Sequence, residues 1–124
     1  MDTDFDFTDV DLDEYVEDSV KGRKILRLEY PLEIKIEDSS GKSVEEIKHI
    51  EFRRPVGRDL DLLDSLADGK SVMSGSRKFV AALVYGESRI TQRKIEELDA
   101  EDVMRCMAVC FGFFQKPSRK TSDQ

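Results

Sequence analysis

The chain has 124 residues, which suits a single domain, and 38% of them are charged, so we expect part of the sequence to lie outside a packed core. The net charge of −7 comes from residues 1–20, which hold nine acidic residues and neither Lys nor Arg. The remainder is close to neutral, which argues against general duplex-DNA binding, because that needs a concentrated cationic surface. The sequence shows no secretory signal and no apolar run long enough to cross a bilayer, so we expect a cytoplasmic protein without a membrane partner.

The N-terminal segment, residues 1–21, alternates aspartates with aromatic and aliphatic side chains such as Phe5, Phe7 and Tyr15. This mixture is too highly charged to hold itself in a core, so we expect a disordered acidic tail. An acidic docking arm, or a mimic of nucleic acid, is the alternative that the same pattern leaves open.

A β-hairpin is predicted over residues 24–54. Between Leu26 and Ile36 apolar residues occupy every second position, which indicates a strand with one buried face. Pro31 cannot donate a ladder hydrogen bond, so it indicates an edge strand or a break between two shorter strands. The Asp-Ser-Ser-Gly sequence at residues 38–41 then provides a turn before a second extended segment.

Helices are predicted after Pro55, because apolar residues return there at three- and four-residue spacing. They are needed to cover the apolar face of the hairpin, since two strands alone are barely stable in water. Thr91 and Asp99 are suitable N-caps. The predicted helices span residues 57–68, 76–86, 91–98 and 99–115. Residues 116–124 lack large apolar side chains and are expected to form a flexible polar tail.

Together these elements predict a single α+β domain over residues 22–115, in which the N-terminal β-hairpin packs against a small bundle of three to four helices. The last helix is unusually apolar, because Arg105 is its one charged residue between Val103 and Phe114. A surface helix normally has a polar side, so this helix is either buried on all sides or faces a partner. Both interpretations stay open.

Catalytic and metal-binding groupings are missing from the sequence. His49 is the only histidine, and the predicted second strand directs it toward solvent. Cys106 and Cys110 lie on one side of a helix but lack the further ligands that zinc needs, which favours buried, unreactive thiols. The glycines match no phosphate-binding or dinucleotide-binding loop. We therefore expect a protein that is not an enzyme and uses no metal or cofactor.

Residues 26–114 resemble the tail assembly chaperones of Mu-like contractile-tailed phages. The similar features, in chain order, are Leu28 and Pro31 in the first strand, Phe-Arg-Arg-Pro at 52–55, Arg-Asp-Leu at 58–60, Leu-Asp-Ala-Glu-Asp at 98–102, and an apolar helix ending in Phe113 and Phe114. Each motif is short, so their order and spacing carry the resemblance. The acidic segment before Lys21 departs from the compact start of that family.

This resemblance implies a protein that binds the tape measure protein, keeps it soluble before the tail tube polymerises, and is absent from the finished particle. The implied mechanism is an apolar surface that covers amphipathic helices of this partner. The residues expected to form the surface, each of which the core could equally use, are Leu63, Phe79, Met104, Met107, Phe111 and Phe114. Self-association is a further expectation. The competing hypothesis is an acidic decoy that binds and inhibits a host DNA-binding protein.

Overall fold

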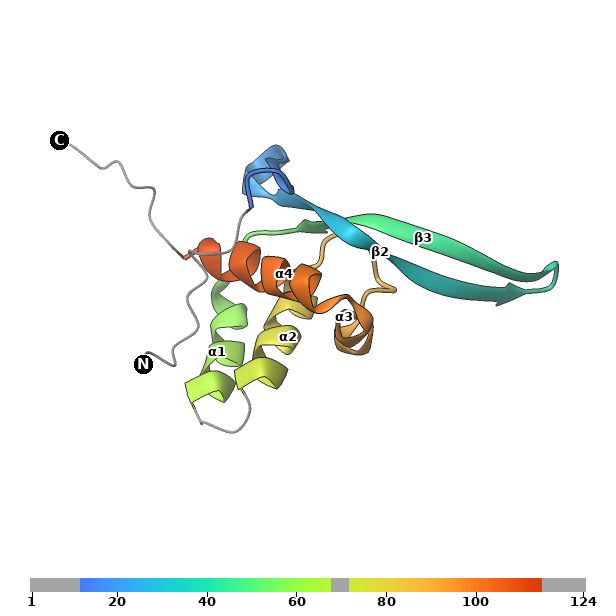
Figure 1. Cartoon of the computed structure of the whole chain (residues 1–124). Coiled ribbons are helices and arrows are strands. Elements are labelled where there is room, and N and C mark those ends of the chain that lie inside the picture. The colour runs from blue at the N-terminus through green and yellow to red at the C-terminus, as the bar shows by residue number, and fades with distance from the viewer. Residues whose placement is uncertain (1–11, 68–71, 115–124) are drawn as a thin grey trace.

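A computed structural model describes residues 12–67 and 72–114, and Figure 1 shows its arrangement. A three-stranded antiparallel sheet of order β1-β2-β3 is followed in the chain by four helices. This confirms the predicted α+β fold. The elements are β1 (Val16–Asp18), β2 (Lys24–Asp38), β3 (Gly41–Phe52), α1 (Leu60–Ala67), α2 (Val72–Leu83), α3 (Gln92–Glu97) and α4 (Ala100–Gly112), with 3₁₀ turns at Val20–Gly22 and Gly57–Asp59.

The long hairpin of β2 and β3 extends well beyond the helices in Figure 1. Alternate residues of β2, including Leu26 and Ile34, are buried, as the two-residue apolar period predicted. At the turn, the backbone N–H and the hydroxyl of Ser40 both donate to Asp38 Oδ1, over 2.9 and 2.6 Å. Gly41 follows with φ of 125°, which L side chains rarely adopt, so the glycine is required at this reversal.

An irregular bulge interrupts the β2–β3 pairing near Pro31. Arg27 pairs with His49 and Leu32 pairs with Ile47, so β2 has several more residues than β3 between these two pairs. β2 continues through the bulge as one strand, and Pro31 leaves no donor unpaired there because it has no backbone N–H. The break into two shorter strands does not occur, and β2 is the central strand of the sheet rather than an edge strand. Pro31 itself lies beyond residues 24–26, where β1 pairs with β2.

The bulge is held by Asp102, which α4 brings against β2. Its two carboxylate oxygens accept the backbone N–H groups of Glu29 and Tyr30, each over 2.9 Å. Arg105 donates to the same carboxylate over 3.0 Å and lies over the ring of Tyr15, 3.9 Å from its centroid. A fully buried carboxylate is thus provided with three hydrogen bonds and a cation.

The helices gather at one end of the hairpin, where α1 and α2 lie side by side and α4 packs against β2 (Figure 1). The Thr91 hydroxyl accepts the backbone N–H of Lys94 over 3.4 Å, and Asp99 Oδ1 accepts that of Glu101 over 2.9 Å. Both predicted N-caps are therefore confirmed. The predicted helix at 57–68 begins instead with the 3₁₀ turn Gly57–Asp59.

The second helix is displaced relative to the predicted range of 76–86. It begins at Val72 and ends at Leu83, and Val84 then forms a β-bridge with Phe52. Ser76, which the prediction used as a helix start, is a buried residue inside α2. Because α2 starts earlier than predicted, Met73 lies on this helix, and it lines the candidate site described below.

Residues 12–22 differ from the disordered acidic tail predicted for residues 1–21. β1 pairs antiparallel with β2, and Val16 lies opposite Leu26. Leu12, Tyr15 and Val16 pack against the hydrophobic core, and Lys24 pairs with Asp18. The prediction weighed the negative charge of the whole segment, whereas here apolar contacts and nearby cations offset that charge. Residues 1–11 and the predicted tail at 116–124 lie outside the described residues.

Arg53 joins the end of the hairpin to the helices. Its guanidinium donates to the carboxylate of Asp59 over 2.8 and 3.1 Å, and to the carbonyl oxygen of Ala82 over 2.9 Å. Asp59 also accepts the backbone N–H of Val56 over 2.6 Å and is only 3% exposed. One ion pair therefore ties together the chain after β3, the start of α1 and the end of α2.

Candidate functional site

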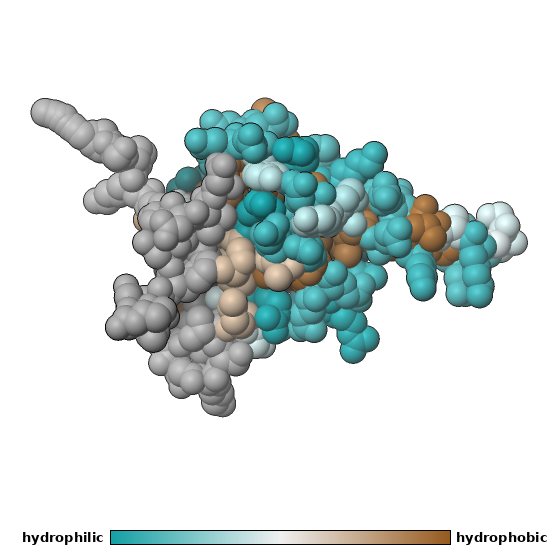
Figure 2. All heavy atoms as spheres, in the orientation of Figure 1, coloured by the Kyte–Doolittle hydropathy of each residue, from teal (hydrophilic) through white to brown (hydrophobic). Residues whose placement is uncertain are grey.

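A groove of about 380 Å³ lies between α2 and α4. Figure 2 shows hydrophobic side chains over α4 on the side that faces the viewer, bordered by hydrophilic residues. Three of the four methionines in the chain line this hollow, and we call it the methionine groove. Its lining residues are Met73, Arg77, Glu96, Leu98, Ala100, Val103, Met104 and Met107.

Helical spacing explains why these side chains converge. Met73 and Arg77 are four residues apart on α2 and so share one side of that helix. On α4, Val103, Met104 and Met107 follow the same three- and four-residue spacing. Met107 is 1% exposed and forms the floor, Met104 is half-buried, and Met73 is 45% exposed at the rim. The groove therefore presents flexible thioethers at several depths, which suits adaptable contact with apolar side chains.

Arg77 and Glu96 supply the charges of the groove. The Arg77 Nε atom lies 3.9 Å from Glu96 Oε2, which is beyond hydrogen-bonding distance. The same Nε is buried, and it has no hydrogen-bond partner in the described parts of the chain. An apolar groove with an unused donor can bind an apolar segment that also carries an acceptor.

A second apolar area, which we call the aromatic end, lies where α4 finishes. Phe111 and Phe114 stack on Phe79, with ring centroids 5.0 and 5.9 Å away. Phe79 is fully buried, so it supports the two rings from within the core. Phe111 is half-buried and Phe114 is 45% exposed. Phe114 therefore offers the larger accessible surface of the two.

Two of the six residues expected from the sequence line the methionine groove, and four do not. Met104 and Met107 lie in the groove; Phe79, Phe111 and Phe114 form the aromatic end; and Leu63 of α1 is half-buried beside the core. Sequence reasoning missed Met73 and Arg77 because it began the helix at Ser76 and so did not place them on one face. It missed Glu96 because the groove arises from contacts between helices.

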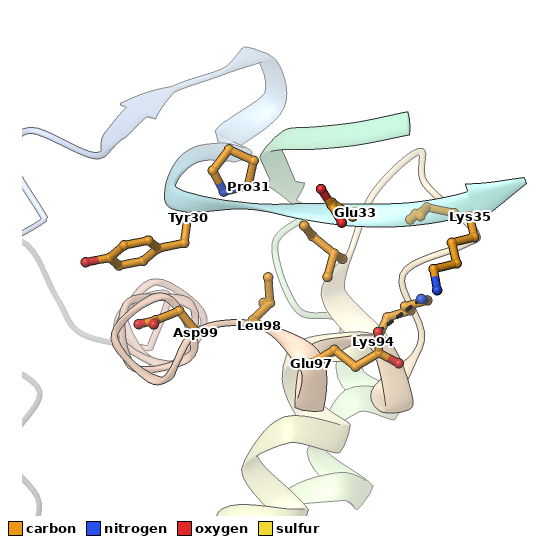
Figure 3. Close-up of a pocket in the computed structure, with 10 residues that line it drawn as sticks. Tyr30, Pro31, Glu33, Lys35, Lys94, Glu97, Leu98 and Asp99 are labelled. Carbon is orange, nitrogen blue, oxygen red and sulfur yellow. Dashed lines mark hydrogen bonds and ion pairs between the residues drawn. The ribbon is translucent and has the colours of Figure 1, made fainter. Parts of the chain in front are cut away.

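A larger cleft, of about 750 Å³, lies between β2 and α3 and is shown in Figure 3. Glu33 and Lys35 line it from the strand, and Lys94 and Glu97 line it from the helix. Lys94 Nζ pairs with Glu97 Oε1 over 3.1 Å, and Lys35 points toward Lys94 (Figure 3). Walls with this mixture of charges favour water over an apolar segment, so the cleft is a weaker candidate for protein binding than the methionine groove.

The residues suited to metal or nucleophilic chemistry are dispersed or buried. Among the described residues no three His, Cys, Asp or Glu side chains are placed to hold a metal ion. Cys106 and Cys110 are buried and free, and burial raises the pKa of both thiols well above the usual range. At Cys106 the charge of Asp102 raises the pKa further. Both thiols are thus protonated at neutral pH and are poor nucleophiles.

Comparison with known protein families matches residues 26–115 to the family described as "Phage tail assembly chaperone proteins, E, or 41 or 14". The chain belongs to this family of phage tail assembly chaperones. The resemblance drawn from the sequence motifs is therefore confirmed. Comparisons of this tail assembly chaperone with curated proteins and with solved structures found no match.

The family match includes β3 and all four helices, and it begins at Leu26 within β2. Both the methionine groove and the aromatic end thus belong to the part of the tail assembly chaperone that the family shares. Membership implies a protein partner in tail assembly and a role other than catalysis. None of the helices in the described ranges is long and apolar enough to span a membrane.

Proposed function

We propose that this tail assembly chaperone binds the tape measure protein and keeps it soluble before the tail tube polymerises. The observation that carries the proposal is the methionine groove between α2 and α4. A hollow of this kind, lined by methionines and bordered by charges, suits one face of an amphipathic helix. We place this action in the host cytoplasm, with the chaperone absent from the finished particle.

The exposed methionines carry the contact in this proposal. Met73 and Met104 are accessible, so an apolar side chain of the client loses water against them on binding. Met107 is buried and shapes the floor, so its substitution changes the fold as well as the groove. Met73 and Met104 are therefore the positions that test binding most cleanly.

The aromatic end extends the same surface in our proposal. Phe114 contributes its exposed ring, and Phe111 contributes the part that the core leaves uncovered. Phe79 supports the two rings from within the core, whereas Leu63 of α1 is half-buried against the core and is not part of the surface that we propose. Phe114→Ser is then expected to weaken client binding, whereas Phe79→Ser is expected to unfold the chaperone.

Co-expression with the tape measure protein of the same phage tests the proposal. The soluble fraction of the client and its co-purification with the full-length chaperone at low salt are measured for each variant. We expect the wild-type chaperone to keep the client soluble. Combining Met73→Ser with Met104→Ser should weaken binding by about tenfold or more, because two partly buried thioether contacts are lost.

A matched control removes apolar surface elsewhere. Val20 and Val44 are 62% and 58% exposed and lie outside the groove, so combining Val20→Ser with Val44→Ser should leave client solubility unchanged. Sedimentation of each variant shows whether self-association changes with the same residues. The proposal fails if the client does not co-purify with the wild-type protein, or if the groove variant performs as well as the control.

A further inference from the structure

The Arg77 side chain is incompletely satisfied in the methionine groove. Its Nε atom is buried and has no hydrogen-bond partner among the residues that the structure describes. Buried donors in native proteins almost always have an acceptor, so one without an acceptor needs an explanation. Arg77 lines the groove and its side chain is 27% exposed, so its guanidinium has to turn toward the groove for Nε to meet an acceptor that a bound partner brings.

Glu96 does not fill this role. Its nearest carboxylate oxygen lies 3.9 Å from Arg77 Nε, close enough to attract the guanidinium but too far for a hydrogen bond. The Glu96 side chain is 48% exposed, against 27% for Arg77, so water reaches the carboxylate far more readily. Glu96 thus offsets the charge of Arg77 in the free protein and competes with any acid that enters the groove.

We propose that the segment which occupies the methionine groove is an amphipathic helix with an Asp or Glu at the edge of its apolar face, and that this carboxylate accepts a hydrogen bond from Arg77. This inference rests on the proposed function and names the chemistry of the client. The apolar side chains of the helix lie against Met73 and Met104, while its acid replaces Glu96 as the partner of the guanidinium.

A carboxylate fits this position better than a neutral acceptor. Hydrogen bonds between arginine and a carboxylate are charge-assisted, and they are roughly twice as strong as neutral ones. The apolar surroundings of Met73, Met104 and Met107 strengthen such a bond further, because little water competes for either partner. Arg77 would therefore determine which helices of the client are bound, while the methionines tolerate many apolar sequences.

This inference is tested with overlapping peptides that cover the tape measure protein. Binding of each peptide to the full-length chaperone is measured by fluorescence anisotropy. We expect the bound peptides to place Asp or Glu beside their apolar stripe. Replacing that acid with Asn or Gln should weaken binding by about tenfold or more, as expected for the loss of a charge-assisted hydrogen bond.

Four variants separate this inference from its alternatives. Arg77→Gln should bind the acidic and amide peptides equally, and Arg77→Lys should recover only part of the preference because it lacks the Nε donor. Glu96→Gln should tighten binding of the acidic peptide, since the competing charge is gone. Arg93→Gln removes an exposed arginine from the adjacent helix α3 and should change nothing.

The possible failures are distinguishable. If no peptide binds, the proposed function itself fails. If peptides bind through Met104 but show no preference for an acid, or if Arg77→Gln keeps the preference, the proposed function stands and this inference is overturned. A peptide of residues 1–11, which alternates Asp with Phe, is added as a competitor. If this competitor displaces the client peptide from the wild-type chaperone but not from Arg77→Gln, the N-terminal segment is the occupant of the groove and our assignment is overturned.

Discussion

The carboxylate of Asp102 accepts the backbone N–H of Tyr30 over 2.9 Å, on the residue immediately before Pro31. The two residues are far apart in the sequence, and their contact holds the apolar helix α4 against the bulge of β2. Because α4 also forms one wall of the methionine groove, this hydrogen bond places the groove relative to the hairpin.

Removal of the Asp102 carboxylate should destabilise the protein severely. Asp102→Ala leaves the N–H groups of Glu29 and Tyr30 and the guanidinium of Arg105 without their buried acceptor. We expect a loss of about 3 to 5 kcal/mol in the free energy of unfolding, measured by urea denaturation. Glu101→Ala, one residue away and exposed, should cost less than about 1 kcal/mol. A loss below about 1 kcal/mol for Asp102→Ala would contradict this role.

The ion pair between Arg53 and Asp59 should make stability depend on pH in the acid range. Hydrogen bonds from Arg53 hold the pKa of Asp59 below its ordinary value, and the Val56 N–H lowers it further. A carboxyl whose pKa is lower in the folded state stabilises the fold fully above its unfolded pKa of about 3.9. That contribution is lost as the pH falls below this value toward the folded pKa.

Urea unfolding of wild type and Asp59→Asn at several pH values measures this effect. The difference in unfolding free energy between them should be constant between about pH 7 and 5, and should shrink below about pH 4. Asp64→Asn, at an exposed position of α1 beyond its first turn, serves as the control and should match wild type throughout. A difference for Asp59→Asn that does not change with pH would show that the pair contributes no pH-dependent stability.

The methionines of the groove should separate into structural and accessible residues. Met107→Ala empties space in a site that is 1% exposed, so we expect a loss of about 2 to 5 kcal/mol in unfolding free energy. Met73→Ala removes a side chain that is 45% exposed and should cost less than about 1 kcal/mol. Denaturant unfolding of the two variants measures both values. Equal losses would mean that Met73 belongs to the core and cannot serve as an open rim.

The two thiols should resist alkylation until the protein unfolds. Burial raises the pKa of Cys106 and Cys110 and also blocks access to reagents. Iodoacetamide labelling followed by mass spectrometry should be at least about a hundredfold slower in the folded protein than in denaturant at the same pH. Rapid labelling of the folded chain would show that the core around α4 opens readily.

The parts of the fold that were predictable from the sequence depend on local chemistry. The alternation between Leu26 and Ile36 follows from the geometry of a strand, and the caps at Thr91 and Asp99 follow from the unpaired N–H groups of a helix start. The strand β1 was not predictable in this way. Its acidic residues indicate disorder when they are counted locally, whereas pairing with β2 and the ion pair between Asp18 and Lys24 stabilise the strand in the folded protein.

By itself the sequence determined the strands, the turn and the helix caps, and with them the α+β class, because each of these elements depends on residues close together in the chain. It also determined the membership of the tail assembly chaperone family, through the order and spacing of short motifs along the chain. Only the tertiary structure decided which apolar residues remain accessible. Met104 and Met107 are three residues apart on one helix, yet packing leaves the first half-buried and seals the second. Burial depends on what the neighbouring helices cover, and no local pattern encodes that.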